Sequence, residues 1–178
     1  MLSKTQKKNI RDRKMKKEEK IIQAKIDLDV IAKSICDLFV KQRLYATCLP
    51  ASLIFHEILD MLHIENQLIN GYQCILNGGN AYMKHFWVRA LGKDYDIGLQ
   101  ITRDISKLNI ETKLCETLPA DAKTIDNETP EEKKNLLEIE QAYALYQKNV
   151  GEFWQLAPGN VYIIRQLALG KEQLRHYK

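Results

Sequence analysis

The chain has few cysteines, prolines and glycines, and it has no long hydrophobic run. Its 178 residues include four cysteines, four prolines and eight glycines. Four irregularly spaced cysteines without a CxxC pair argue against a disulfide framework or a zinc knuckle. They favour a reducing compartment such as the cytoplasm as the location of the protein. Delivery of the protein into a host cell and its packaging in a particle stay open as alternatives. The sequence contains no run of 18 apolar residues, so it predicts no membrane span. No apolar segment follows the basic N-terminus, so it predicts no secretory signal.

Charge is unevenly distributed along the chain. The formal net charge is +4, but residues 1–25 hold ten Lys or Arg against three acidic residues, which gives +7 there and −3 elsewhere. We predict that residues 1–25 form a basic arm, disordered or a solvated helix, and that residues 26–178 form a single domain. The arm is either a solubilising tail or a docking segment for nucleic acid, an acidic partner or an anionic membrane surface.

Hydrophobic periodicity predicts two helices at the start of this domain. The first helix carries an apolar stripe from Ile31 to Phe39 and should end near Arg43. A second helix should follow almost at once, because Thr47 is a good N-cap residue and Pro50 is tolerated in a first turn.

The middle of the chain then changes to strand character. The segments 68–76, 82–90 and 95–101 are typical of β-strands, and NGGN (77–80) is a turn signal. Residues 102–128 alternate short apolar and polar pieces, and we expect them to run over the surface, either as an ordinary connection or as a lid. The sequence therefore predicts an α+β domain in which helices pack on a small antiparallel sheet.

The last third of the chain is typical of helices. Thr129 as N-cap, Pro130 in the first turn and Glu132 closing a capping box mark the start of one helix. We expect Gly151 to break it and residues 161–176 to form a closing helix, so that helices flank the sheet at both ends of the domain.

Three side chains between these helices carry complementary chemical roles. Cys48 opens the second helix, His85 follows 37 residues later, and Asp96 follows eleven further on. Unpaired N–H groups and the dipole at a helix N-terminus favour a thiolate, which is the nucleophilic form of cysteine. His85 can take the thiol proton and return it to a leaving group, while Asp96 fixes the imidazole tautomer. The order Cys48, His85, Asp96 therefore predicts a thiol-based acyl-transfer site.

Other residues are candidates for the surroundings of this site. The backbone N–H of Cys48 is a natural oxyanion donor, and the side chain of Gln42, six residues earlier, is a candidate for a second. Trp87, Phe153 and Trp154 are candidates to line a substrate cleft, although large aromatic side chains also belong to cores.

The register of the predicted hairpin decides whether His85 and Asp96 meet. A two-residue turn at Gly92-Lys93 places Asp96 opposite Arg89, roughly 13 Å along the strand from His85, with Gln100 facing the histidine instead. A four-residue loop over 89–92 places Asp96 directly opposite His85. The triad is therefore expected to need the wider loop.

The segments CLPASLIFHEILDML, HIENQLINGY, HFWV and YDIG together resemble the transglutaminase-like core of the papain-like cysteine enzyme superfamily. The resemblance covers about 55 residues, from Cys48 to Ile101. It implies a papain-like fold with nucleophile Cys48, base His85 and orienting residue Asp96. Phe86 stands where the family usually has a small residue, and Ile97-Gly98 stands where it often has Pro-Thr.

Two kinds of function remain open from the sequence. One is a thiol enzyme that hydrolyses an amide or isopeptide bond of a protein or peptide, or passes its acyl group to an amine as transglutaminases do. The other is an inactive binding or structural protein in which Cys48 is a small buried hydrophobe and the basic arm does the docking. No cofactor is expected, nor a metal, because His56 and His63 lie seven residues apart and match no zinc signature even with Cys74.

Overall fold

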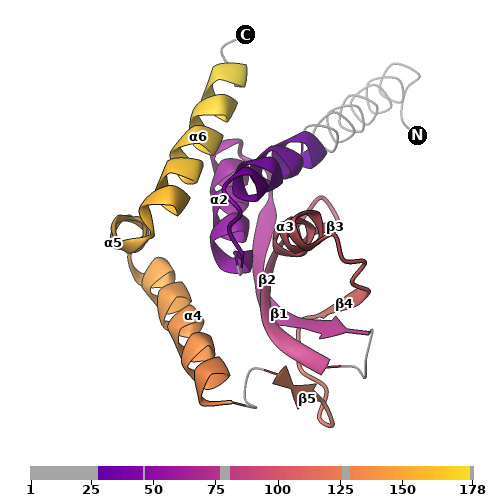
Figure 1. Ribbon diagram of the computed structural model, residues 1–178. Helices are drawn as coiled ribbons and strands as arrows, with labels where there is room; N and C mark the ends of the chain where they lie inside the picture. Colours follow the sequence, from indigo (N-terminus) through magenta and orange to yellow (C-terminus); the bar gives the residue numbers. More distant parts are fainter. Residues whose placement is uncertain (1–27, 46, 77–80, 126–128, 177–178) are drawn as a thin grey trace, which may run out of the picture.

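The computed structural model describes residues 28–45, 47–76, 81–125 and 129–176, and Figure 1 shows the arrangement of its elements. The predicted basic arm, residues 1–25, and the predicted turn at 77–80 lie outside the described residues. Helices surround a small, mostly antiparallel sheet, so the predicted α+β class is confirmed.

Among the described residues, two helices precede the sheet, as the hydrophobic pattern predicts. The first covers residues 28–41 and buries Ile31 and Phe39. The second, α2 (Cys48–Met61), begins at the predicted cysteine and buries most of its apolar face. Thr47 occupies the N-cap position, but its side chain makes no capping hydrogen bond.

In the part of the chain that the structure describes, five strands form the sheet, and four of them follow the order β3-β2-β1-β4. Their bounds are β1 (Asn66–Ile75), β2 (Ala81–Ala90), β3 (Lys93–Tyr95), β4 (Thr112–Cys115) and β5 (Lys123–Thr124). β1 and β2 form one long antiparallel hairpin, β4 adds to the other side of β1, and β5 runs parallel to the start of β2. Within the segment 102–128, which we expected to be a surface excursion, residues 112–115 and 123–124 therefore form two strands of the sheet.

The prediction of a strand over 95–101 is wrong beyond Tyr95. The three-residue β3 returns from β2 through a two-residue turn at Leu91-Gly92, where both residues have positive φ, as the tight hairpin turn demands. The chain then enters α3 (Ile97–Ser106), and the side chain of its N-cap, Asp96, accepts the N–H of Leu99. This cap explains the outcome, since it stabilises a helix start in a segment whose β-branched residues favour a strand.

Three helices complete the chain along one side of the molecule: α4 (Pro130–Lys148), α5 (Val150–Leu156) and α6 (Gly159–His176). The predicted capping box of Thr129 and Glu132 is present, with both of its hydrogen bonds. The predicted break at Gly151 is wrong, because Asn149 ends α4 and its side chain caps α5 by accepting the N–H of Glu152. Gly151 lies inside α5.

Buried polar and aromatic contacts attach these last helices to the rest of the domain. The carboxylate of Glu57 on α2 accepts hydrogen bonds from Trp154 Nε1 at 2.5 Å and Arg165 Nε at 2.7 Å. The ring of Tyr143 on α4 packs against Phe86 on β2, with the centroids 5.1 Å apart. The C-terminal helices therefore pack against α2 and β2.

Across the described ranges, we find no helix with the length and apolar composition needed to span a membrane.

Candidate active site

Cys48 is the first residue of α2, and its side chain is partly buried. The first N–H groups of a helix have no partner within that helix. Pro50 has no N–H to offer, and the N–H of Ala51 is bonded to the carbonyl oxygen of Thr47 at 3.0 Å. The N–H groups of Cys48 and Leu49 are therefore the donors that this helix end presents beside the thiol.

His85 lies on β2, on a stretch of strand that is covered on both faces. The four consecutive residues His85, Phe86, Trp87 and Val88 are all buried, and His85 is 4% exposed. Ser52, one turn after Cys48 on α2, donates its hydroxyl to the carbonyl oxygen of Phe86 at 3.0 Å. This buried bond fixes α2 against β2 next to both Cys48 and His85.

Asp96 is the hydrogen-bonding centre of the site. Its Oδ1 lies 2.7 Å from His85 Nε2 and also accepts the backbone N–H of Leu99 at 2.9 Å. Its Oδ2 accepts the side-chain amide of Gln73 at 3.1 Å. The carboxylate is thus held on both oxygens, and one residue both caps α3 and orients the histidine.

The hairpin register differs from both registers that we considered. Ala90 pairs with Lys93, so Asp96 follows the end of β3 rather than lying opposite Arg89 or His85. Because β3 stops at Tyr95, the Asp96 carboxylate reaches His85 from the start of α3. The expectation that the triad needs a four-residue loop is therefore wrong, since a tight turn one residue earlier together with a helix start achieves the same contact.

Gln73 is a site residue that the sequence analysis missed. It lies on β1, two residues after Gly71, which pairs directly with His85. Side chains two residues apart on a strand share one face of the sheet, so Gln73 points to the face of His85. Gln73 is buried and its amide needs a partner, but that partner, Asp96, lies 23 residues away, so no local pattern in the sequence indicated this role.

The surroundings of His85 favour its protonated form. Burial opposes a charge on the imidazole, but the hydrogen bonds and negative charges of Asp96 and Cys48 outweigh it, and they raise the pKa of His85 from about 6.5 to about 10. Because Cys48 is one of the groups that raise this pKa, its thiol lies near the imidazole, and Nδ1 is the ring nitrogen that the hydrogen bond with Asp96 leaves free. An imidazolium held beside a thiol is the arrangement of a thiolate–imidazolium pair.

We expect the imidazole of His85 to remain protonated at pH 8, where an ordinary histidine is neutral. NMR titration of protein labelled at histidine measures this directly. Asp96→Asn should lower the pKa of His85, because it removes the neighbouring charge and leaves the burial, while asparagine remains a good N-cap for α3. If the pKa of His85 in the unmodified protein is 6.5 or lower, burial outweighs the hydrogen bonds and charges of Asp96 and Cys48.

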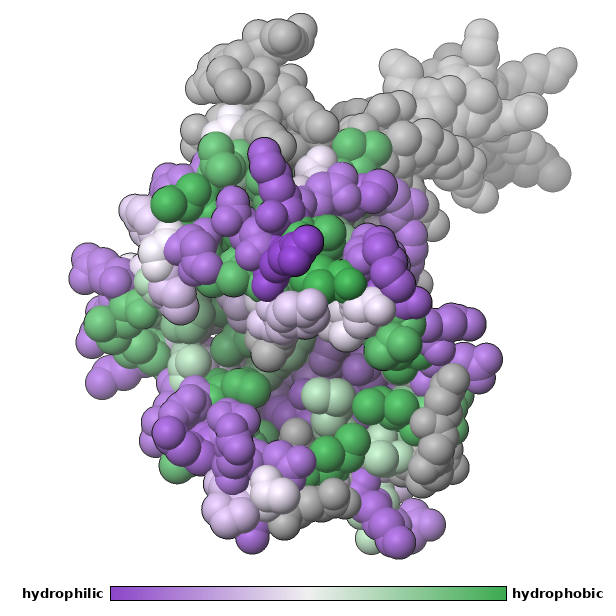
Figure 2. All heavy atoms as spheres, viewed as in Figure 1, coloured by the Kyte–Doolittle hydropathy of each residue, from purple (hydrophilic) through white to green (hydrophobic). Residues whose placement is uncertain are grey.

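A cavity of about 630 Å³ adjoins Cys48. The start of α2 forms one wall and the C-terminal helices form the other, with Ile139 and Ala142 from α4 and Phe153 from α5. Figure 2 shows hydrophobic residues bordering a recess between the α4 side and the sheet side of this face. Cys48 therefore lines a mostly apolar hollow.

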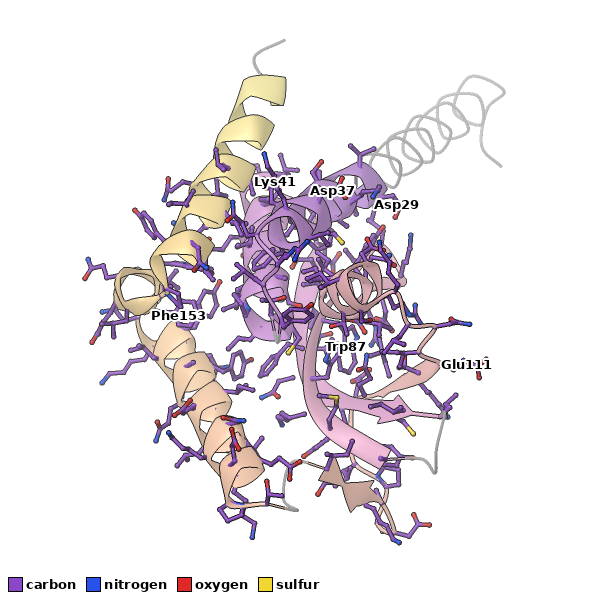
Figure 3. The ribbon with its side chains drawn as sticks, in the orientation of Figure 1. Asp29, Asp37, Lys41, Trp87, Glu111 and Phe153 are labelled. Carbon is purple, nitrogen blue, oxygen red and sulfur yellow. The ribbon has the colours of Figure 1, made fainter. Side chains whose placement is uncertain are left out.

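Of the other predicted site residues, Gln42, Trp87 and Trp154 do not line this cavity. Gln42 is exposed in the turn after the first helix and does not line it. Trp154 is buried and bonded to Glu57, and Trp87 is buried with its ring stacked near His85 at a centroid distance of 6.4 Å. Figure 3 shows Trp87 and Phe153 to either side of β2, and of the three aromatic candidates only Phe153 lines the hollow.

Trp87 instead supports the sheet beneath the site. A side chain on Gly71 would meet the Trp87 ring at 2.5 Å and the carbonyl oxygen of Cys115 at 2.6 Å. The glycine therefore lets the indole approach β1 closely, next to the histidine with which it stacks.

Within the described residues, no group of three or more His, Cys, Asp or Glu side chains could hold a metal ion. Comparisons with protein-family models, with curated proteins and with solved structures found no match for this chain.

Proposed function

We propose that this chain is a thiol-dependent acyl-transfer enzyme that hydrolyses an amide or isopeptide bond. The observation that carries the proposal is the Asp96–His85 hydrogen bond of 2.7 Å beside the thiol of Cys48 at a helix N-terminus. Nucleophile, base and orienting carboxylate are the three roles that cysteine acyl transfer needs. The proposal includes the transglutaminase-like, papain-like fold that the sequence resembles.

The reaction would proceed in two steps. The Cys48 thiolate attacks the carbonyl carbon, the C–N bond breaks, and the His85 imidazolium gives its proton to the departing amine. In the second step water gives a proton to His85 and attacks the thioester, which releases the carboxylic acid and restores the thiolate–imidazolium pair. The N–H groups of Cys48 and Leu49 are the nearest donors for the oxyanion in both steps.

A generic activated ester, p-nitrophenyl acetate, tests the proposal without knowledge of the natural substrate. We expect a burst of p-nitrophenol and an acetyl thioester located on Cys48 by mass spectrometry, followed by turnover. Cys48→Ala should lose both the burst and the turnover. Acetylation of Cys115 as fast as of Cys48, or no burst, would contradict the proposal.

The same experiment separates hydrolysis from amine transfer. Addition of glycinamide offers an amine acceptor in competition with water. Hydrolysis predicts that acetate remains the main product, whereas acetylglycinamide as the main product would indicate a transferase. The alternative function as a binding protein depends on residues 1–25, which lie outside the described residues.

A further inference from the structure

The cavity next to Cys48 is built from parts of the chain that the triad does not use. Leu44 and Tyr45 come from the loop before α2, and the opposite wall comes from the C-terminal helices beyond residue 129. Its volume of about 630 Å³ lies within the range of roughly 300–1,000 Å³ that is usual for ligand sites. The hollow therefore has the size of a substrate site and opens onto the nucleophile.

We propose that this cavity binds the acyl side of a peptide substrate and selects a large aliphatic or aromatic side chain there; this inference rests on the proposed function. The acyl part stays attached to the sulfur through both steps, whereas the amine leaves after the first. A cavity whose wall includes Cys48 is therefore placed to hold the acyl part. Its lining is dominated by apolar side chains, among them Leu49, Ile139 and Phe153.

The polar residues of the cavity favour a peptide over a plain hydrocarbon chain. Asn135, Glu138 and Asn160 lie at exposed positions on its rim. Thr47 is 7% exposed, lines the cavity beside Cys48, and has no hydrogen-bond partner for its Oγ1 among the residues that the structure describes. A buried hydroxyl without a partner is costly, and a peptide N–H or C=O would satisfy it, whereas an alkyl chain would not.

The C-terminal helices would then set the specificity. Ala142 on α4 lines the cavity with its small side chain, whereas Ala144, two residues further on, is exposed on another face of the helix. Ala142→Phe should fill part of the hollow, and Ala144→Phe is a matched control that adds the same ring to the same helix. Thermal unfolding of both variants checks that the fold is kept.

Chloromethyl ketones that alkylate Cys48 test the inference. We expect acetyl-Leu and acetyl-Phe chloromethyl ketones to inactivate the protein about ten-fold faster or more than the Gly and Lys analogues, because burial of a large apolar side chain is worth at least that much. Ala142→Phe should remove most of this preference and Ala144→Phe should keep it. Thr47→Val should slow the peptide reagents more than it slows the small reagent iodoacetamide.

The outcomes separate this inference from the proposed function. Fast iodoacetamide reaction at Cys48 with no preference among the peptide reagents would overturn the inference and leave the enzyme proposal standing. A decyl chloromethyl ketone that reacts faster than the Leu and Phe reagents would also overturn it, in favour of a fatty acyl donor. A Cys48 that is inert to iodoacetamide would instead refute the function itself.

Discussion

Iodoacetamide at pH ~6 is expected to modify Cys48 about 10- to 100-fold faster than Cys115, the other partly exposed cysteine. An ordinary thiol is only about 0.3% thiolate at this pH, so a thiolate held by an imidazolium gains up to ~300-fold in its reactive form. The lower nucleophilicity of such a thiolate offsets part of that gain. Mass spectrometry of partly modified protein assigns the rate of each cysteine.

His85→Gln should remove this advantage. Glutamine is close to histidine in size and can still donate a hydrogen bond to Asp96, but it cannot carry the positive charge that stabilises the thiolate. His56→Gln is the matched control, because His56 is also hydrogen-bonded, to Asn66, but lies in the second half of α2 away from the thiol. We expect this control to react as fast as the unmodified protein.

The remaining cysteines provide internal references. Burial raises the pKa of Cys36 to about 12, with the neighbouring Asp104 adding to the effect, so this thiol should stay unmodified in the folded protein. Cys74 is buried as well. Unfolding in urea should make all four cysteines react at similar rates. If folded Cys48 reacts no faster than Cys115, the inactive binding protein becomes the better interpretation.

The elements that carry the triad could be predicted because their signals are local. The position of Cys48 at a helix start could be predicted from the apolar stripe of α2. The β1–β2 hairpin could be predicted from two apolar runs on either side of a turn signal. The capping box of Thr129 is likewise read from three neighbouring residues. Each of these features depends on residues that are close in the sequence.

The geometry at Asp96 could not be predicted in this way. Asp96 is preceded by a strand and followed by Ile97, and its role as an N-cap depends on where β3 ends. Gln73 and Ser52 act through partners 23 and 34 residues away, which no local pattern reveals. The cavity depends on α4 and α5 lying opposite Cys48, and that is set by tertiary contacts such as Phe86 with Tyr143.

The second large effect is expected at Gly98, where α3 touches the start of α2. A Cβ on Gly98 would lie 2.7 Å from Cys48 Cα and 2.8 Å from Cys48 Cβ, closer than carbon atoms approach without a shift of the backbone. Gly98→Ala should therefore destabilise the fold by about 1–3 kcal/mol, as other overpacking substitutions do. It should also move the thiol relative to His85 and slow alkylation at pH ~6.

Gly170→Ala is the control that makes this prediction specific. Both glycines lie within helices, but a Cβ on Gly170 would meet nothing within 4 Å. Helix propensity alone favours alanine over glycine by roughly 0.5–1 kcal/mol, so the control should be neutral or more stable. Urea unfolding of both variants measures the difference. Opposite signs for the two substitutions would show that the contact with Cys48, rather than helix propensity, requires a glycine at position 98. Stabilisation by both substitutions would refute the close approach of α3 to Cys48.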